Sequence, residues 1–315
     1  MSKLFGNHRV QVAAALFMSG VLAACGGDAG SQSRTTERVP QGPQVAVADP
    51  VPTTPVETTT PPAPVIRNVS YRDAESVYRK GRYGDAAELF GVYVEEQPDH
   101  GQGHYMLGLS AWKSGDHDRA ERALQRAVEL DGESVKARTN LGRVLLEQGR
   151  PHDALPHIEK AVELAAESPE VWRVLGNVKA ELSRHDEALD AYRSALVRNE
   201  NDAWSMNNYA LVLIQLGRYQ DALPPLARAV ELVPGSATFQ NNLGVALERA
   251  GVLGSARRAF TAALAADSTY GKAQISLSRV QSRLGEAEGE VTDLTTAARM
   301  FIEEIQRWRV SDHEC

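Results

Sequence analysis

From residue 67 onward the sequence repeats itself every 34 residues, and this period limits the possible folds more than any other feature. Six segments of equal length follow one another without an insertion or deletion: 67–100, 101–134, 135–168, 169–202, 203–236 and 237–270. The twentieth residue of each segment is alanine, and the eighth is alanine or glycine. Repeats of this length each form a small unit that buries its apolar face against its neighbours. We therefore expect a stack of six similar units.

Each repeat is predicted to form two packed helices. In the third repeat Leu141, Gly142 and Leu145 share one helical face. Gly149 interrupts the pattern, and a second helical face begins at Ala154. Small residues let the two axes approach, while large side chains fill the grooves, among them Phe90, Leu124, Ile158, Tyr192 and Phe260. The turn between the helices carries glycine in five repeats and serine in one: Gly81, Gly115, Gly149, Ser183, Gly217 and Gly251.

This spacing of glycine, alanine and leucine resembles the tetratricopeptide repeat (TPR) family over about 200 of the 315 residues. The resemblance implies an all-α fold, a right-handed superhelix of helix–turn–helix pairs. Residues 271–285 repeat the first-helix pattern and are expected to form a capping helix. Residues 290–309 are predicted to form an amphipathic helix, which either packs on the end of the solenoid or docks a partner or a second copy of the chain.

The N-terminus has the features of a targeting segment. Lys3 and Arg9 precede an apolar run, residues 10–21, that is too short to span a bilayer. The run ends in Leu22-Ala23-Ala24-Cys25, which resembles a bacterial lipobox. The resemblance implies that residues 1–24 are a signal peptide and that Cys25 carries a diacylglycerol and an N-acyl chain. The alternative is a plain secretory peptide with an incidental cysteine.

Residues 25–66 are predicted to be a lipidated cysteine followed by a disordered tether. Eight of the fifteen prolines lie in this segment, among Gly, Ser and Thr. Stretched as polyproline II, a tether of about 40 residues reaches ~120 Å. In such lipoproteins an aspartate after the cysteine resembles an inner-membrane retention signal, and Gly26 stands at that place. We expect an outer-membrane anchor facing the periplasm.

Charge and cysteine content argue against nucleic-acid binding and limit disulfide formation. The chain has 34 Lys and Arg against 41 Asp and Glu, and removal of Lys3 and Arg9 with the signal changes the net charge from −7 to about −9. An acidic surface disfavours nucleic-acid binding, which depends on neutralising phosphates. With Cys25 lipidated, Cys315 is the one remaining cysteine, so no disulfide within the chain can form. Cys315 is then either a spare thiol or forms a disulfide between chains.

The sequence predicts neither an enzyme nor a metal or cofactor site. It contains no P-loop, no dinucleotide-binding fingerprint, no nucleophile elbow and no HExxH motif. His100 and His104 are spaced i, i+4 beside Asp99, a spacing that metal sites use. They fall at a repeat junction, where solvent-exposed histidines at a helix start are expected instead.

A binding groove is predicted on the concave face that the first helices of TPR solenoids build. Asn140, Asn208 and Asn242 share the sixth place of their repeats, and Asn207 and Asn241 precede two of them. An amide both donates to and accepts from the backbone of an extended peptide. The row resembles the asparagine ladder of some TPR peptide binders, although asparagine is also simply common at this place in the family.

Basic and apolar residues complete the predicted groove. Arg143, Arg173 and Asn177 partly resemble the carboxylate clamp of TPR cochaperones. The resemblance is incomplete, because Thr238 and Asn242 stand where that clamp has basic residues. Aromatic and apolar anchors for a partner, some of which are alternatively packing residues between repeats, are predicted at Tyr105, Leu109, Trp112, Trp204 and Leu211.

The features together predict a non-catalytic scaffold or adaptor. It would bind a protein or peptide partner in the groove and attach to the membrane through its lipid. One alternative is an assembly factor similar to the TPR pilotin lipoproteins that escort secretin subunits of type IV pili. Another is an adaptor for peptidoglycan hydrolases.

Overall fold

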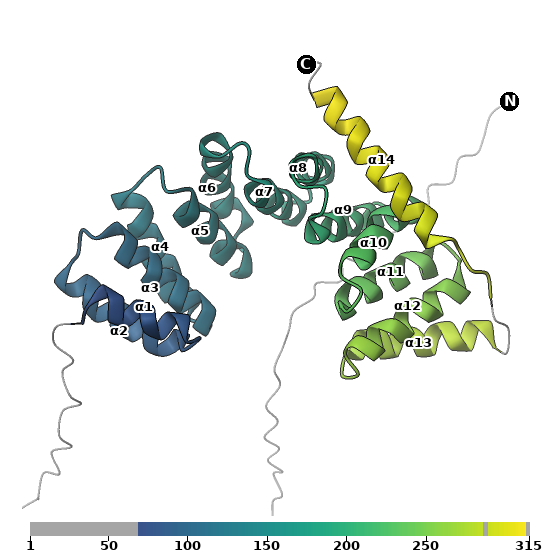
Figure 1. Cartoon of the computed structure of the whole chain (residues 1–315), viewed down its shortest axis with the longest axis horizontal. Helices are drawn as coiled ribbons and strands as arrows, with labels where there is room; N and C mark the ends of the chain where they lie inside the picture. Colours follow the sequence, from purple (N-terminus) through teal and green to yellow (C-terminus); the bar gives the residue numbers. More distant parts are fainter. Residues whose placement is uncertain (1–68, 286–288, 313–315) are drawn as a thin grey trace, which may run out of the picture. The chain divides into compact units, whose positions relative to one another are not determined.

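The computed structural model describes residues 69–285 and 289–312. The predicted signal peptide, the predicted lipidation site Cys25, the predicted tether and Cys315 lie outside the described residues. Fourteen α-helices and no β-strand occur in the described ranges, which confirms the all-α prediction (Figure 1). None of the helices found there is long and apolar enough to cross a membrane.

Each of the six repeats forms two helices, as the period predicts. The first helices are α1 (Tyr71–Arg79), α3 (Gly101–Ser114), α5 (Val135–Glu147), α7 (Pro169–Glu181), α9 (Ala203–Gln215) and α11 (Ala237–Arg249). The second helices are α2 (Tyr83–Glu96), α4 (His117–Leu130), α6 (Pro151–Leu164), α8 (His185–Arg198), α10 (Tyr219–Leu232) and α12 (Leu253–Ala266). They are followed by α13 (Gly271–Leu284) and α14 (Leu294–Asp312). Each helix packs on the next one along the chain up to α13, which produces the solenoid.

Close approach of the two helices in a repeat depends on the small residue at the eighth place. In the fourth repeat a Cβ atom added to Gly176 would lie 2.5 Å from Cε1 of Tyr192, so a side chain there would collide with the ring. The residues at the place of Tyr192 are completely or almost completely buried in every repeat: Phe90, Leu124, Ile158, Tyr192, Leu226 and Phe260. This confirms that they fill the space between helices.

The turns between paired helices require a left-handed backbone. Gly115 has φ of +89° and Gly149 has φ of +72°, which glycine adopts without steric cost. Ser183 occupies this turn in the fourth repeat with φ of +58°, and it is the one non-glycine residue with positive φ in the described chain. Serine therefore keeps the turn of the other repeats at the cost of local strain.

The first repeat begins later than its 34-residue period suggests. Helix α1 starts at Tyr71, because Ser70 caps it: the Ser70 Oγ accepts a hydrogen bond from the Asp73 backbone N–H at 3.2 Å. Helix α1 is therefore shorter than the other first helices, at nine residues.

The C-terminal helix packs on the side of the solenoid rather than on its end. Helix α14 contacts α10 and α8 and has no close contact with α13 (Figure 1). Phe301, Ile305 and Trp308 on its apolar stripe are buried. The rings of Phe301 and Trp308 lie 6.1 and 5.7 Å from the ring of Tyr209 in α9. The expected packing on the end of the solenoid was therefore wrong.

Two local features set the position of α14. The segment before it is tied to the start of α12, since the Thr292 N–H donates to Ser255 Oγ at 2.9 Å. Asp293 then begins the helix by accepting from the backbone N–H groups of Thr295 and Thr296, both at 3.1 Å. The helix thus spans Leu294–Asp312, and the residues at 290 and 291 precede it instead of forming its first turn.

Candidate functional site

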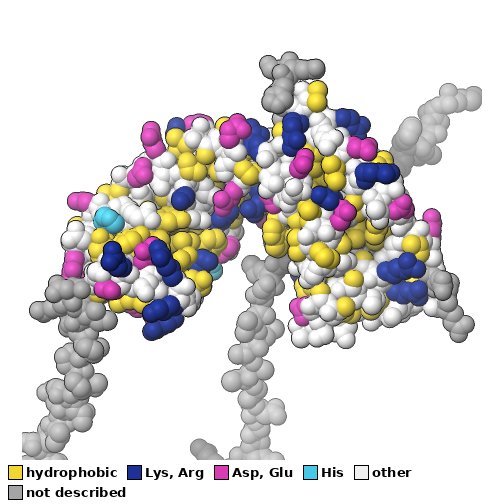
Figure 2. All heavy atoms as spheres, in the orientation of Figure 1, with side chains coloured by type: hydrophobic (Ala, Val, Ile, Leu, Met, Phe, Trp, Pro, Cys, Tyr) yellow, Lys and Arg dark blue, Asp and Glu magenta, His cyan; other side chains and the backbone are white. Residues whose placement is uncertain are grey.

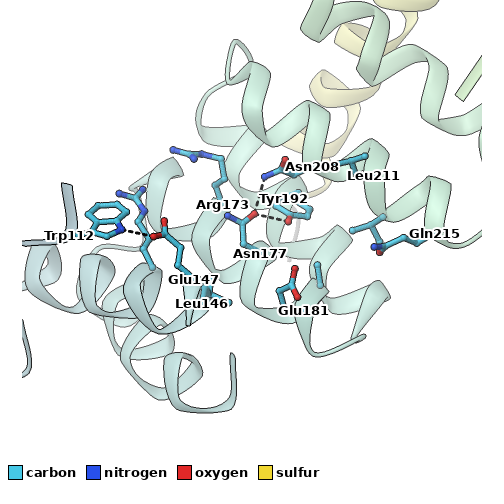
Figure 3. A pocket seen from close by; sticks show the side chains of 13 residues that line it. Trp112, Leu146, Glu147, Arg173, Asn177, Glu181, Tyr192, Asn208, Leu211 and Gln215 are labelled. Carbon is cyan, nitrogen blue, oxygen red and sulfur yellow. Dashed lines mark hydrogen bonds between the residues drawn. The ribbon is translucent and has the colours of Figure 1, made fainter. Parts of the chain in front are cut away.

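First helices line two adjoining pockets, the first of which we call the main pocket. A pocket of about 520 Å³ lies over α3, α5, α7 and α9, and Tyr192 of α8 is the one residue of a second helix in its lining (Figure 3). A second pocket of about 600 Å³ adjoins it, because Trp112 and Arg143 line both. Together we call these two pockets the groove. Basic and acidic side chains are mixed over the face seen in Figure 2, with apolar side chains between them.

The amide groups of five asparagines form one hydrogen-bonded row across α11, α9 and α7. The Nδ2 of Asn241 donates to Oδ1 of Asn242 at 3.3 Å, and the Nδ2 of Asn242 donates to Oδ1 of Asn207 at 2.8 Å. Asn207 then donates to Asn208 at 3.0 Å, and Asn208 donates to Asn177 at 2.9 Å. Because each amide donates in the same direction, every Nδ2–Oδ1 orientation in the row is fixed by its neighbour.

Asn177 ends this row in the groove. Its Oδ1 accepts both the Asn208 amide and the Tyr192 hydroxyl, the latter at 2.8 Å (Figure 3). Burial raises the pKa of the Tyr192 hydroxyl, so this group remains a protonated donor. With both acceptor positions of Oδ1 used, the amide presents its NH₂ group as the part that can bind a carbonyl oxygen.

The predicted asparagines thus differ in what they can do. Asn207 and Asn241 are 2% and 6% exposed, so they lie beneath the surface and hold the other amides. Asn177 and Asn208 line the groove, and Asn140 lines its second pocket. Asn242 is half-buried outside both pockets. Contact between any of these amides and a partner stays a prediction.

The two groove arginines are already paired with carboxylates. Arg143 Nη2 donates to Glu170 Oε1 at 2.7 Å, and Arg173 Nε donates to Asp202 Oδ2 at 3.0 Å. Arg143 Nη1 also donates to Asn140 Oδ1 at 3.3 Å. These pairs fix the guanidinium groups but neutralise much of their charge, so the middle of the groove is less cationic than a carboxylate clamp requires.

The predicted anchors lie in three places. Tyr105, Leu109 and Trp112 line the second pocket, where Tyr105 OH accepts from Asn140 Nδ2 at 3.2 Å. Leu211 lines the main pocket and is 36% exposed. Trp204 is 54% exposed but lies outside both pockets, since its ring packs edge-on against Phe239 with centroids 4.9 Å apart.

Tyr192 is a groove residue that the sequence reasoning assigned only to the core. Its ring fills the space beside Gly176, as predicted, but its hydroxyl reaches Asn177 in the groove. The available signal was a tyrosine at a place where the other repeats have leucine, isoleucine or phenylalanine. Glu147 was also missed: it lines the main pocket and accepts from Trp112 Nε1 at 2.7 Å.

The paired histidines have structural roles. His100 caps α3 by accepting from the Gly103 N–H at 3.0 Å, and His104 Nε2 lies 2.9 Å from the carbonyl oxygen of Pro98. Within residues 69–285 and 289–312, no group of three or more His, Cys, Asp or Glu side chains is placed to hold a metal ion.

Protonation of Glu248 in α11 is expected to affect the stability of the fold at acidic pH. Glu248 is 7% exposed, and Arg279 of α13 donates to its two oxygens at 2.7 and 2.6 Å. This hydrogen bonding keeps the pKa of Glu248 below its ordinary value of 4.5. A carboxylate with a lowered folded-state pKa stabilises the fold above its unfolded pKa, and that contribution is lost as pH falls through the folded pKa.

We therefore expect the free energy of unfolding to fall as pH drops below 4.5, in part through Glu248. Urea unfolding of the parent and of Glu248→Gln at neutral and acidic pH measures this contribution. The variant should be less stable at neutral pH and lose less stability on acidification. An identical pH dependence of stability in both proteins would show that Glu248 does not contribute to it.

Comparisons with known proteins agree on the fold. A family model described as tetratricopeptide repeat matches residues 71–135, 105–166, 139–203 and 208–271. The APC/C hetero-tetramer Cut9–Hcn1 matches with 20% identity and a TM-score of 0.59, over 66% of this chain and 41% of that chain. The chain therefore spans less than half the length of that protein. A thermophilic TPR protein in Thermus thermophilus matches with 20% identity and a TM-score of 0.51, over 58% of this chain and 99% of that chain. No curated protein matches the chain in sequence.

Proposed function

Because the chain belongs to the tetratricopeptide repeat family, we propose that it is a non-catalytic adaptor that binds a segment of a partner protein in the groove. Repeat solenoids of this kind use their extended concave surfaces for binding other proteins. The observation that carries the proposal is the groove itself, in which mainly first-helix side chains line two adjoining pockets of about 520 and 600 Å³. It combines an apolar anchor surface with amides whose direction is fixed.

An extended segment fits this groove better than a compact domain. The NH₂ group of Asn177 offers donors to a main-chain carbonyl, a contact that does not depend on the partner's sequence. Trp112, Leu146 and Leu211 line the same pocket and offer apolar surface for the partner's side chains. Main-chain contacts then supply affinity and the apolar contacts supply selectivity.

The proposal includes a lipid anchor at Cys25. Its support is the sequence: the basic head, the short apolar run and Leu22-Ala23-Ala24-Cys25. A diacylglycerol and an N-acyl chain hold a protein stably on a membrane, at ~0.8 kcal/mol per buried CH₂ group. The groove would then work at the periplasmic face of the outer membrane, at the end of the tether that begins at Gly26.

Capture of a partner from a cell-envelope extract tests the groove. We expect Leu211→Glu to weaken capture by about 30-fold, which corresponds to ~2 kcal/mol, because it places an unpaired carboxylate on the anchor surface. The fold should be unaffected, since Leu211 is 36% exposed. Capture by the full chain and by this variant is compared by quantitative mass spectrometry.

Met300→Glu is the matched control for this experiment. Met300 is 56% exposed and lies on α14, away from the groove lining, and the substitution introduces the same charge. Equal losses in both variants would contradict the groove proposal. Selective loss of a secretin subunit would identify the pilotin-like function, and selective loss of a peptidoglycan hydrolase would identify the hydrolase adaptor.

A further inference from the structure

Three arginines gather in a separate pocket at the C-terminal end of the first-helix face. The pocket has a volume of about 310 Å³ and is lined by Glu248 and Arg249 of α11 and by Arg279 and Arg283 of α13. Three guanidinium groups face one carboxylate, so the lining carries a net positive charge. This is a local departure from a chain whose overall formal charge is −7.

Glu248 holds two of the guanidinium groups in position. Arg279 binds it through Nε and Nη2 at 2.7 and 2.6 Å, and Arg283 Nη1 donates to it at 3.3 Å. Arg279 Nη2 also donates to Ser276 Oγ at 3.2 Å. These contacts neutralise one positive charge and orient both side chains, which reduces the entropy that a bound anion would have to remove.

Donor groups remain available after these contacts. Arg283 is bound only through Nη1, which leaves its Nε and Nη2 without an acceptor among the described residues. Arg249 is exposed and has no hydrogen bond or ion pair to any residue in the described ranges. Arginine forks bind carboxylates in a bidentate manner, as Arg279 already does with Glu248.

The position of these arginines relates them to the groove. Arg279 and Arg283 occupy the ninth and thirteenth places of the first-helix pattern, the places of Leu211 and Gln215 in the fifth repeat. Leu211 and Gln215 line the main pocket. The pocket of Arg249, Arg279 and Arg283, which we call the arginine pocket, is therefore on the same helical face, further along the solenoid.

We propose that the arginine pocket binds an acidic stretch of the same partner whose extended segment occupies the groove. This inference rests on the proposed function and names the chemistry of the partner. Its apolar residues would lie in the groove, and its Asp or Glu side chains would lie in the arginine pocket at the C-terminal end of the solenoid. A carboxylate peptide is favoured over a phosphate-bearing surface because the pocket lies on the same helical face as the groove and already forms a bidentate carboxylate contact.

Binding of an acetylated oligoglutamate peptide to the full chain tests the arginine pocket. We expect the double variant Arg249→Glu/Arg283→Glu to bind this peptide about tenfold more weakly than the parent. The control is Arg122→Glu/Arg258→Glu, which makes the same charge change on exposed side chains of α4 and α12. The control should change the dissociation constant by less than about twofold. Circular dichroism establishes that both variants are folded.

Several outcomes would overturn the inference. Equal weakening in both double variants would mean that only overall charge matters. Tighter binding of inorganic phosphate, or of phosphatidylglycerol vesicles, than of oligoglutamate would assign the pocket to a phosphate group instead. Absence of oligoglutamate binding to the parent would also contradict the proposal.

Partner capture separates this inference from the function on which it rests. If capture falls in Leu211→Glu but is unchanged in Arg249→Glu/Arg283→Glu, the groove proposal stands and the arginine pocket has no part in partner binding. If neither substitution changes capture, the proposed function itself fails. Loss of capture in both supports a partner that spans the groove and the arginine pocket.

Discussion

Replacing Tyr192 with alanine is expected to lower the free energy of unfolding by about 3 to 5 kcal/mol. The side chain is 2% exposed and fills the space that Gly176 leaves between α7 and α8. Neighbouring helices cannot collapse into this space, so the variant loses both the transfer free energy of the ring and its packing contacts. Urea unfolding followed by circular dichroism measures the loss.

Tyr192→Phe is the control, because it keeps the ring and removes only the hydroxyl bonded to Asn177. We expect it to cost about 1 kcal/mol, the typical contribution of a single hydrogen bond. If alanine and phenylalanine destabilise the protein equally, packing of the ring is not what holds the fourth repeat together.

Replacing Cys25 with serine is expected to move nearly all of the protein from the membrane fraction to the soluble fraction. Serine cannot form the thioether bond to diacylglycerol, so the acyl chains that would hold the protein on the membrane are not attached. Loss of several acyl chains removes many times ~0.8 kcal/mol of membrane affinity. Fractionation of cells and incorporation of labelled palmitate measure the change.

Cys315→Ser is the matched control, since it removes the other cysteine of the chain. It should stay in the membrane fraction and keep its label. Membrane attachment of Cys25→Ser at the parent's level would show that the lipobox resemblance is incidental.

The repeats were predictable because the interactions that form them are local in sequence. Gly176 and Tyr192 meet across one turn, and the same pair of places meets in the other three repeats that have glycine at the eighth place. Six copies of one pattern reveal which places must be small and which must be large. The left-handed turn at Ser183 was predictable for the same reason, since the other repeats have glycine there.

The position of α14 was not predictable from its own pattern. An apolar stripe shows that Phe301 and Trp308 must be buried, but it does not identify the surface that buries them. That surface includes Tyr209 and Arg193, which both lie about 100 residues before Trp308 in the chain. The guanidinium carbon of Arg193 is 4.8 Å from the centroid of the Trp308 ring. Such distant contacts leave no periodic signal in one sequence.

The helices that line the groove were predictable from the repeat pattern, but the hydrogen bonds between the groove residues were not. The repeat pattern put Asn207 and Asn208 on the correct helix, yet one is buried and the other lines the pocket. Which amide groups face a ligand depends on bonds between repeats, such as Asn208 to Asn177. The sequence contains the residues of this row but not its direction.

The most direct test of the groove is photo-crosslinking from position 211. A photoreactive amino acid replaces Leu211 in one protein and Met300 in another, and each is irradiated in living cells. We predict a crosslinked partner from position 211, with the attachment site in an extended and partly acidic segment, and none from position 300. A partner that crosslinks from position 300 and not from position 211 would contradict this prediction.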